Sequence, residues 1–456
     1  MSYFSEFTYL AASILFIFGL KGLSHPDTAR RGMNLAALGM LMAVVGTLVR
    51  HEIVRYEWII AGLVIGSIIG AAMSIWMPMT AMPQRTALSH AFGALAAALV
   101  GVSEYYRHGE TLGAFKMTAI GLEVMLGGIT VTGSLMAFIK LQDLIRGTPI
   151  TYKGQNIFNI TLFVITAAIF VYLIFVPTAA VLFYIMVGLA FLFGILLVLP
   201  IGAADMPVVM SLMNSYAGLA AAATGFAISN NVLIIAGTLD GFSGFILSIL
   251  MCKAMNRSVT NVLFGAFGAE SPTVAGQTEG VMREVNVEDV AVQMAYARQV
   301  VFVPGYGMAT AQAQHIVREL GDLLEARGVS VKYAIHPVAG RMPGHMNVLL
   351  AESNVPYSAL YELEQINPEF HSTDVAVVIG ANDVVNPDAR DNPQSPIAGM
   401  PILEVDRAHS VIVLKRGKGK GFAGIENPLF FKPNTGMLYG DAKASLTKLA
   451  QAVQHA

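Results

Sequence analysis

The sequence predicts a polytopic α-helical membrane domain of about nine helices, followed by an α/β domain built on a parallel sheet. Three observations support this fold class. First, 55% of the 456 residues are apolar and only 13% are Asp, Glu, Lys or Arg, about half the charged share of a soluble domain. Second, the apolar excess lies almost entirely before residue 253. Third, short apolar strands alternate with helical segments after residue 286, which is typical of a parallel sheet covered on both faces.

Nine apolar runs account for the membrane domain. Most are close to the roughly 20 residues that an α-helix needs to cross a bilayer, although the first two are marginal in length. No basic residue precedes Lys21, so we interpret the first run as a retained helix and not as a secretory signal. The runs span residues 7–23, 33–49, 58–77, 87–102, 117–139, 157–176, 179–199, 208–228 and 232–252.

The distribution of basic residues predicts the orientation, because cytoplasmic loops collect Lys and Arg. Loops after odd-numbered runs carry nine of these residues, and loops after even-numbered runs carry four. We therefore expect the N-terminus outside the membrane and everything after Arg257 in the cytoplasm. The membrane domain is placed at residues 1–252, a linker with many helix breakers at 253–286 and the soluble domain at 287–456.

Charge and cysteine content exclude several classes of function. A net charge of −2 excludes a general electrostatic attraction to nucleic acid, so no nucleic-acid partner is expected. A single cysteine, Cys252, can form neither an internal disulfide nor a zinc cluster. His336 and His345 are spaced like no common metal site, so no metal is expected.

The soluble domain is predicted from its alternation of apolar strands and helices. We expect strands at residues 299–303, 329–335, 375–379, 401–405 and 411–414, and helices at 287–298, 309–327, 357–366 and 441–453. In parallel sheets of this kind, ligands bind at the carboxyl ends of the strands. The residues that follow each strand are therefore the candidates for a binding site.

The first strand runs into a glycine-containing turn, Gly305-Tyr306-Gly307, and a helix follows. Such a turn lets backbone N–H groups and a helix N-terminus approach a diphosphate. Thr310 stands where the usual fingerprint has its third glycine, so a tight turn without a ligand remains an alternative. The stretch 304–307 also resembles part of a potassium filter, but it follows a soluble strand and does not lie between membrane helices.

Two strand ends indicate which nucleotide is bound. The second strand ends at Ile335-His336 without the acidic residue that binds an NAD ribose. A later strand ends at Lys415-Arg416-Gly417. A cationic pair at this place suits the additional 2′-phosphate of NADP, and a solvated strand end is the alternative.

Two further loops carry polar candidates. Asn382 and Asp383 follow the strand at 375–379 and could hydrogen-bond a ribose or a nicotinamide carboxamide, although an Asx turn would use the same residues. The polar loop 336–345 brings Arg341 within reach of a phosphate.

Ionisable and polar residues are few in the membrane runs, so each is a candidate for transport. His90 is the residue whose charge changes most easily near neutral pH. Interhelical hydrogen bonding is the alternative for these residues, and Asp205 could simply cap a helix. The candidates are His90 in the fourth run, Glu123 and Ser134 in the fifth, Asp205 before the eighth, Asn214 and Ser215 within it and Asp240 in the ninth.

Several long stretches resemble the β subunit of the proton-translocating NAD(P) transhydrogenases. They include Met251-Cys-Lys-Ala-Met-Asn-Arg257, Pro304-Gly-Tyr-Gly-Met-Ala309, His336-Pro-Val-Ala-Gly-Arg341, Gly380-Ala-Asn-Asp383 and Ser395-Pro-Ile-Ala-Gly-Met-Pro401. The resemblance covers about the last 250 residues. The first 200 match mainly in layout, together with His90 and Thr132-Gly-Ser134.

The resemblance implies a subunit whose membrane domain conducts protons and whose Rossmann-like soluble domain binds NADP(H). NAD(H) would be carried by a partner α subunit, in a dimer of αβ units within the inner (cytoplasmic) membrane. Hydride would pass directly between the two cofactors, so no side chain is expected to act as a catalytic group. The proton route would contain His90, Glu123, Ser134, Asp205 and Asn214.

The resemblance also assigns the cofactor site. The loop from Gly305 to Ala309 and Arg341 would contact the diphosphate, Lys415 and Arg416 the 2′-phosphate, and Asn382 and Asp383 the nicotinamide side. The complete expected set is Gly305, Tyr306, Gly307, Met308, Ala309, Gly340, Arg341, Met342, Pro343, Gly380, Ala381, Asn382, Asp383, Lys415, Arg416, Gly417, Gly421 and Asp441.

Two departures and one rival function accompany this expectation. Gly417 replaces a serine, and Phe422 a tyrosine, that many relatives carry. The rival is an ion transporter gated by a cytoplasmic nucleotide-binding domain, which would have the same layout of helices and sheet. Such a transporter predicts a filter-like loop between membrane helices, and the sequence shows none.

Overall fold

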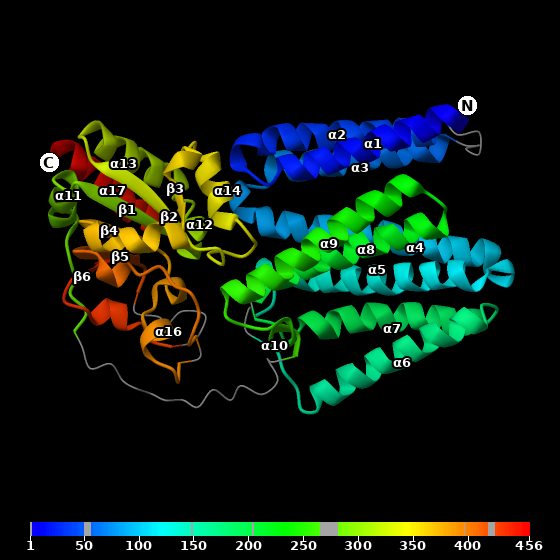
Figure 1. The fold of residues 1–456 in the computed structure, drawn as a ribbon. Helices are drawn as coiled ribbons and strands as arrows, with labels where there is room; N and C mark the ends of the chain where they lie inside the picture. The colour runs from blue at the N-terminus through cyan, green and yellow to red at the C-terminus, as the bar shows by residue number, and fades with distance from the viewer. Residues whose placement is uncertain are drawn as a thin grey trace. The chain divides into compact units, whose positions relative to one another are not determined.

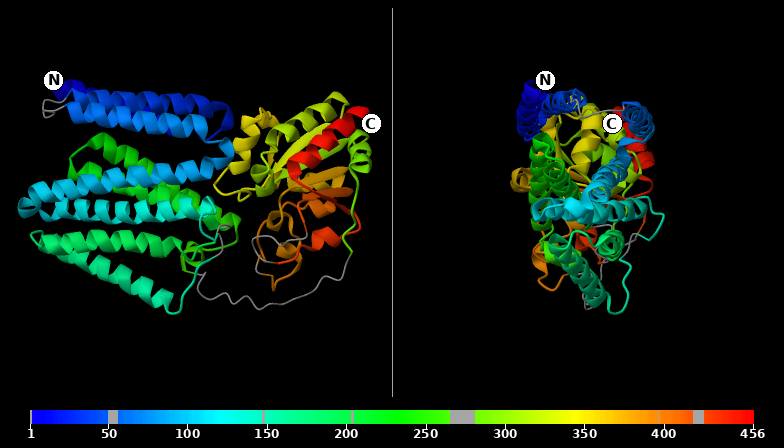
Figure 2. Two further views of the ribbon diagram at one scale, coloured as in Figure 1. Left: turned by 180° about the vertical axis from the view of Figure 1, so that it is seen from behind. Right: turned by 90° about the vertical axis from the view of Figure 1, so that its right-hand side faces the viewer.

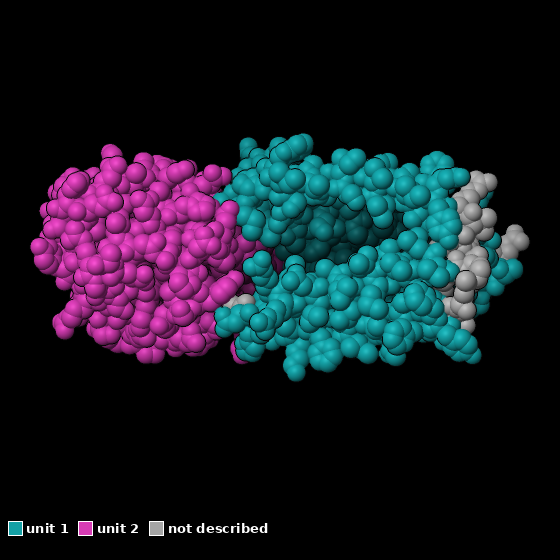
Figure 3. All heavy atoms as spheres, turned by 90° about the horizontal axis from the view of Figure 1, so that it is seen from above, with its two compact units in different colours: residues 1–201, 209–248 teal, residues 202–208, 249–456 magenta. Residues whose placement is uncertain are grey.

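The computed structural model describes residues 2–49, 56–146, 149–202, 205–264, 281–395, 397–417 and 425–456. By its internal contacts the chain divides into two compact units, each described by itself below (Figure 3). The first comprises Met1–Ile201 and Val209–Ser248, and the second comprises Gly202–Val208 and Ile249–Ala456. Gly421 and Phe422 fall outside the described residues.

Nine helices among the described residues are long and apolar enough to cross a membrane, which confirms the predicted membrane domain. Each coincides with one predicted apolar run to within a few residues. They are α1 (Ser2–Gly22), α2 (Pro26–Leu48), α3 (Glu57–Trp76), α4 (Met82–His108), α5 (Ala114–Leu141), α6 (Gln155–Phe175), α7 (Ala180–Val198), α8 (Met206–Ala227) and α9 (Asn231–Ala254) (Figure 1).

Helices α5 and α8 are the most enclosed of the nine, with 61% and 72% of their spanning windows buried. Small residues allow α5 to fit between two neighbours: Gly127 lies against Ala98 of α4, and Gly128 lies against Ala190 of α7. By contrast, α3 buries no residue. Its glycines at 62, 66 and 70 meet no other atom of the described chain within 4 Å of a Cβ position.

Lys140 belongs to the last turn of α5 and not to a loop, as the count of loop charges had assumed. Its side chain is fully buried. The ammonium donates to the carbonyl oxygens of Val198 at 3.2 Å and Ile201 at 2.7 Å, and also to that of Leu199. The lysine thereby satisfies the carbonyl groups that the C-terminal end of α7 leaves without helical partners.

The soluble domain contains one six-stranded sheet in the order β3-β2-β1-β4-β5-β6. All strands are parallel, which confirms the predicted α/β class; for example, Val300 of β1 is aligned with Val331 of β2 and with Val375 of β4. This strand order is that of a dinucleotide-binding Rossmann fold. The strands are β1 (Gln299–Pro304), β2 (Ser330–Ile335), β3 (Leu360–Glu362), β4 (Val375–Ile379), β5 (Ser410–Lys415) and β6 (Thr435–Tyr439).

Helices cover one face of the sheet. Helix α17 packs against α11 and α13, and Figure 2 shows α17 alongside α13. The opposite face carries a buried cluster in which Val301 and Val378 meet Phe370 and Phe430. The helices of this domain are α11 (Val287–Ala295), α12 (Tyr306–Thr310), α13 (Gln314–Ala326), α14 (His345–Glu352), α15 (Leu363–Ile366), α16 (Asp388–Asp391) and α17 (Ala442–His455), and α10 (Val259–Phe264) precedes them.

Three expectations for this domain are wrong. The helix predicted at 309–327 is two helices, because Gln312 adopts a φ of 50° between α12 and α13. The helix predicted at 357–366 contains β3, which pairs with β2. Residues 401–404 form no strand, and the sixth strand is β6, which the sequence did not indicate.

Residues just before α11 add to the edge of the sheet. Glu284 forms a parallel bridge with Met437 of β6. The Val285 N–H donates to the Met437 carbonyl at 3.1 Å, and the Met437 N–H donates to the Arg283 carbonyl at 2.7 Å. The segment 283–285 therefore pairs with the soluble domain's last strand.

Candidate functional site

The strand order reverses direction between β1 and β4, and the loops that leave these two strands meet there. In open α/β sheets this switch point is where a nucleotide binds. The Gly305 N–H donates to the Ile379 carbonyl, and the Gly307 N–H donates to the Gly380 carbonyl, both at 2.9 Å. The loop after β1 and the loop after β4, predicted separately as candidates, thus form one site.

Glycine is required on both sides of this contact. A Cβ on Gly307 would lie 2.6 Å from the Gly380 Cα. Gly380 itself adopts a φ of +64°, and a Cβ there would lie 2.3 Å from the Gly307 Cα. The two backbones can approach this closely only without side chains, and two of the turn's N–H groups are used for the contact.

Arg341 lies beside the turn. Its side chain is 7% exposed, and its guanidinium carbon stands 4.2 Å above the centre of the Tyr306 ring, an arrangement typical of a cation–π contact. The Arg341 backbone N–H donates to Nδ1 of His345 at 3.1 Å. His345, which the sequence did not single out as a site residue, therefore helps to hold the loop that carries the arginine.

Asn382 is held by a residue that sequence reasoning missed. The side-chain amide of Asn427 donates to the Asn382 carbonyl at 3.0 Å and to its Oδ1 at 3.1 Å. Four residues on, the Asn386 amide donates to the Glu426 carbonyl at 3.2 Å. The segment before η9 (Pro428–Phe431) therefore fixes the loop after β4.

The side chains of Lys415 and Arg416 lie in different environments, the first partly buried and the second exposed. The Lys415 ammonium lies 4.4 Å above the Phe430 ring. Burial lowers the pKa of Lys415, and the attraction of Asp383 acts in the opposite direction. Arg416 is exposed to solvent, and a side chain added at Gly417 would meet no atom within 4 Å. Asp383 and Lys415 are therefore electrostatic partners across the carboxyl ends of β4 and β5.

Of the remaining expected residues that the structure describes, all but one lie at or near the same loops. Met308, Ala309, Met342 and Ala381 are buried. Asp441 follows β6, at the edge of the sheet away from the switch point. Its carboxylate accepts the Ala444 N–H at 3.0 Å, which is the bond of a helix N-cap for α17.

His336 follows β2 and is almost fully buried. Its Nε2 hydrogen-bonds the Pro401 carbonyl at 2.7 Å, and its Nδ1 accepts the Val338 N–H at 3.2 Å. Burial lowers the pKa of His336 to about 4, against the Pro401 hydrogen bond, which acts to raise it. The imidazole is thus a neutral connector between two loops. Among the described residues, no group of three His, Cys, Asp or Glu side chains could hold a metal.

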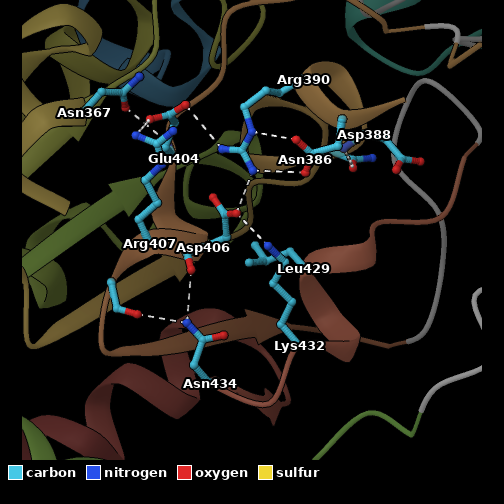
Figure 4. A network of polar contacts seen from close by, with 12 residues as sticks. Asn367, Asn386, Asp388, Arg390, Glu404, Asp406, Arg407, Leu429, Lys432 and Asn434 are labelled. Atoms are coloured by element: carbon cyan, nitrogen blue, oxygen red, sulfur yellow. Dashed lines mark hydrogen bonds and ion pairs between the residues drawn. The ribbon is translucent and has the colours of Figure 1, made fainter. Parts of the chain in front are cut away.

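The loop that supplies Pro401 is fixed by a charged network (Figure 4). Arg390 bonds to Asp391, Glu404 and Asp406, and Lys432 also bonds to Asp406 at 2.6 Å. Although burial acts to raise it, the pKa of Asp406 is lowered because both cations bond to its carboxylate. A cavity of about 580 Å³ borders this network, lined by Leu363, Asn367, Arg390, Met400, Pro401 and Glu404 among others.

In the membrane unit, the structure brings some candidates together. The Asn214 side chain on α8 is hydrogen-bonded to His90 on α4. Its amide nitrogen also donates to Oδ1 of Asp240 on α9 at 3.2 Å. Separately, Oε1 of Glu123 on α5 accepts a hydrogen bond from the Thr224 hydroxyl of α8 at 2.7 Å. Thr224 was missed because a single threonine in an apolar helix carries no distinguishing signal.

The two other membrane candidates lie apart from these groups. Ser134 is fully buried on α5, and its hydroxyl has no hydrogen-bond partner among the described residues. Nη1 of Arg257 donates to both carboxylate oxygens of Asp205, each at 2.7 Å. It is thus an ion-paired residue ahead of α8, in the unit that contains the sheet.

Comparison with known proteins shows the family of the chain. A family model described as the NAD(P) transhydrogenase beta subunit matches residues 5–452. Two curated relatives, from Rhodospirillum rubrum and from its strain ATCC 11170, are both named NAD(P) transhydrogenase subunit beta. Each is 48% identical to this chain over 455 residues, which is 98% of either sequence.

Proposed function

The chain belongs to the family of NAD(P) transhydrogenase beta subunits, and on that premise we propose that it binds NADP(H) at the β1–β4 switch point. In the proposed reaction, hydride passes directly between this NADP(H) and an NAD(H) held by an α subunit. The observation that carries the proposal is the strand order, whose switch point lies between β1 and β4, where the loops that leave these two strands are hydrogen-bonded to each other. Arg341 supports it by its contact with Tyr306 of the first loop.

The site chemistry supports a phosphorylated nucleotide. Arg341 is a buried cation beside the glycine turn, where a diphosphate would need a charged donor. Since the Gly305 and Gly307 N–H groups already bond to carbonyls, we assign most of the diphosphate contact to Arg341. Arg416 is exposed at the end of β5 and is the residue proposed to bind the 2′-phosphate.

The residues of the chain supply no acid or base to the hydride step. When bound, the nicotinamide supplies the redox chemistry. The protein's part is to orient the ring, and the Asn427–Asn382 hydrogen bonds support that role by fixing the loop after β4. Lys415 balances the charge of Asp383 in this loop.

We propose that the membrane unit conducts protons past His90, Asn214 and Glu123, with Ser134 on the same route. The support is that His90 and Asn214 are hydrogen-bonded across helices α4 and α8, and that the Glu123 carboxyl is buried against Thr224. One charge crossing 100 mV supplies about 2.3 kcal/mol, enough to shift a near-balanced cofactor pair more than tenfold. Asp205, which is paired with Arg257, is proposed as a further residue of this route.

We further propose an αβ assembly in the inner membrane, with the N-terminus outside and the soluble domain in the cytoplasm. The excess of basic residues in the loops after odd-numbered spans supports this orientation. The rival function, a nucleotide-gated ion transporter, predicts no redox partner, and membership in the transhydrogenase family argues against it.

Arg416→Ala tests the nucleotide assignment. Loss of the guanidinium removes a charge-assisted bond to the 2′-phosphate, so we expect NADPH binding to weaken by roughly tenfold or more while NADH binding stays nearly constant. The measurement is calorimetric titration of the detergent-solubilised chain with each nucleotide. Equal losses for the two nucleotides would remove Arg416 from the 2′-phosphate site.

A further inference from the structure

Helix α9 contributes a carboxyl group to the surroundings of His90. The Asn214 amide nitrogen donates to Oδ1 of Asp240 at 3.2 Å, while the same side chain is hydrogen-bonded to His90. Three helices, α4, α8 and α9, therefore each supply one member of a chain of polar side chains that runs from His90 to Asp240.

The order of donors and acceptors along this chain follows from the carboxylate. An ionised carboxylate only accepts hydrogen bonds, so the NH₂ group of Asn214 faces Asp240 and its carbonyl oxygen is left for His90. Nδ1 of His90 has no hydrogen-bond partner among the described residues. We assign the contact with Asn214 to Nε2–H, so that Nδ1 keeps the lone pair that can take up a proton.

Glycines allow α8 and α9 to approach closely enough for this contact. A Cβ on Gly244, one turn after Asp240, would lie 2.9 Å from the Asn214 amide nitrogen and 2.7 Å from the Ser215 backbone nitrogen. A Cβ on Gly218 would lie 2.3 Å from the Gly241 backbone nitrogen. The helices are thus in backbone contact on both sides of the Asn214–Asp240 bond, which fixes its geometry.

The position of Asp240 calls for a functional explanation. It is the tenth residue of the 24-residue α9, about 14 Å from the helix start, and its side chain is exposed on the surface of this chain. A carboxylate at the centre of a helix facing lipid is energetically costly. A residue kept at this depth needs water beside it and a charge to compensate.

Asn214 connects Asp240 to His90, whereas the other charged groups of α4, α5, α8 and α9 have separate positions. Glu123 bonds to Thr224 beside Gly101 of α4, eleven residues and about 16 Å along α4 from His90. Lys140 is engaged with the end of α7. The remaining charged residues of α4, α5 and α9 lie toward the helix ends: Arg85, Glu104, Arg107, His108, Lys116 and Lys253.

We propose that Asp240 is a positioning residue of the proton route, which supplies the counter-charge for a protonated His90 through Asn214. A proton that binds Nδ1 gives an imidazolium with one positive charge, and the carboxylate of Asp240 balances it. Asn214 carries no proton; it accepts from Nε2–H and donates to Asp240 in both states of His90. The inference rests on the proposed proton route and adds to it an acidic residue on α9.

Asp240→Asn tests the inference, because it keeps the shape of the side chain and removes the charge. The chain is reconstituted with its α subunit in vesicles, and acidification driven by NADPH and an NAD⁺ analogue is followed with a pH-sensitive dye. We expect D240N to slow acidification at least tenfold, and D240E, which restores the charge, to return it to within about threefold of the unmodified protein.

Two controls separate a charge effect from a folding effect. Ser248→Ala changes another residue of α9, whose hydroxyl bonds only within its own helix, and should acidify at the unmodified rate. NADPH binding to the same preparations should be equal in all variants. Unchanged acidification by D240N, or an equal loss in D240E and D240N, would overturn the role of Asp240. Failure of the unmodified assembly to acidify would instead refute the proposed proton route itself.

Discussion

At the scale of single residues, the site depends on groups that connect loops. His336 joins the loop after β2 to Pro401, and Asn427 joins the loop after β4 to the segment before η9. His345 supports the backbone of Arg341. Each of these side chains bonds a backbone group outside its own residue, so each is expected to matter for the shape of the site more than for its charge.

Because His336 is buried, we expect the stability of the soluble domain to depend on pH. The folded domain holds the pKa of His336 at about 4 through burial, against an ordinary value of 6.5. The unfolded chain therefore binds the proton more readily. The contribution of His336 to the free energy of unfolding is therefore fully present above pH 6.5. It is lost as the pH drops from 6.5 to 4, by about 3 kcal/mol in total.

The measurement is the urea unfolding of a fragment that begins at Val281, at several pH values. His336→Gln keeps a donor for the Pro401 carbonyl but does not titrate, so its unfolding free energy should lose this part of the pH dependence. A variant with the same acid-induced loss as the unmodified fragment would show that other groups cause it.

Sequence predicted the residues with distinctive chemistry and missed those that support them. Gly305, Gly307, Arg341 and Asn382 were recognisable because each follows a strand and has a phosphate- or ribose-binding chemistry. Asn427 and Thr224 gave no signal, since their importance comes only from the residue opposite them in space. Asp441 stays a predicted cofactor residue, and the structure adds that it caps α17, a role that an aspartate before a helix often has.

At the scale of elements, the long apolar helices and the central strands were predictable, and the short elements were not. Strand β4 and the membrane helices have uninterrupted apolar sequences that fix their type. Strand β6 contains Gly436 and follows Asn434, so its sequence looks like a turn. Gly436 is needed there because a Cβ would lie 2.6 Å from the Val285 side chain, a contact that no local pattern contains.

Helix α7 depends on Lys140 at its C-terminal end. Lys140→Met removes a buried ammonium and leaves three carbonyl groups without their donor. Each such bond contributes about 1.5–3 kcal/mol, so we expect a loss of several kcal/mol in the unfolding of the membrane unit. Unfolding in mixed micelles, followed by circular dichroism, measures it.

Lys153→Met provides the matched control, because Lys153 is an exposed residue between α5 and α6. It should leave the unfolding curve unchanged within about 0.5 kcal/mol. If the two variants unfold alike, the contacts of Lys140 with the end of α7 do not stabilise the membrane unit.

At the scale of the whole molecule, membership in a family of beta subunits implies a partner α subunit. The described sheet has a single switch point, and the sequence shows one dinucleotide-binding fingerprint, at Gly305–Gly307. We therefore expect the purified chain to bind NADP(H) but to catalyse no net hydride exchange between NADPH and an NAD⁺ analogue. Addition of the α subunit should start the reaction, measured by absorbance of the reduced analogue. Full activity of the chain alone would refute the need for the partner.

The pairing of residues 283–285 with β6 has a consequence for how the soluble domain should be isolated. These residues occupy the backbone groups of a strand that would otherwise end the sheet. A fragment that begins at residue 287 would leave β6 as an edge strand with unpaired backbone N–H and C=O groups. Such edge strands pair with other chains and cause aggregation. A fragment that begins a few residues earlier keeps residues 283–285 paired with β6. We therefore expect the longer fragment to be monodisperse and the shorter one to precipitate.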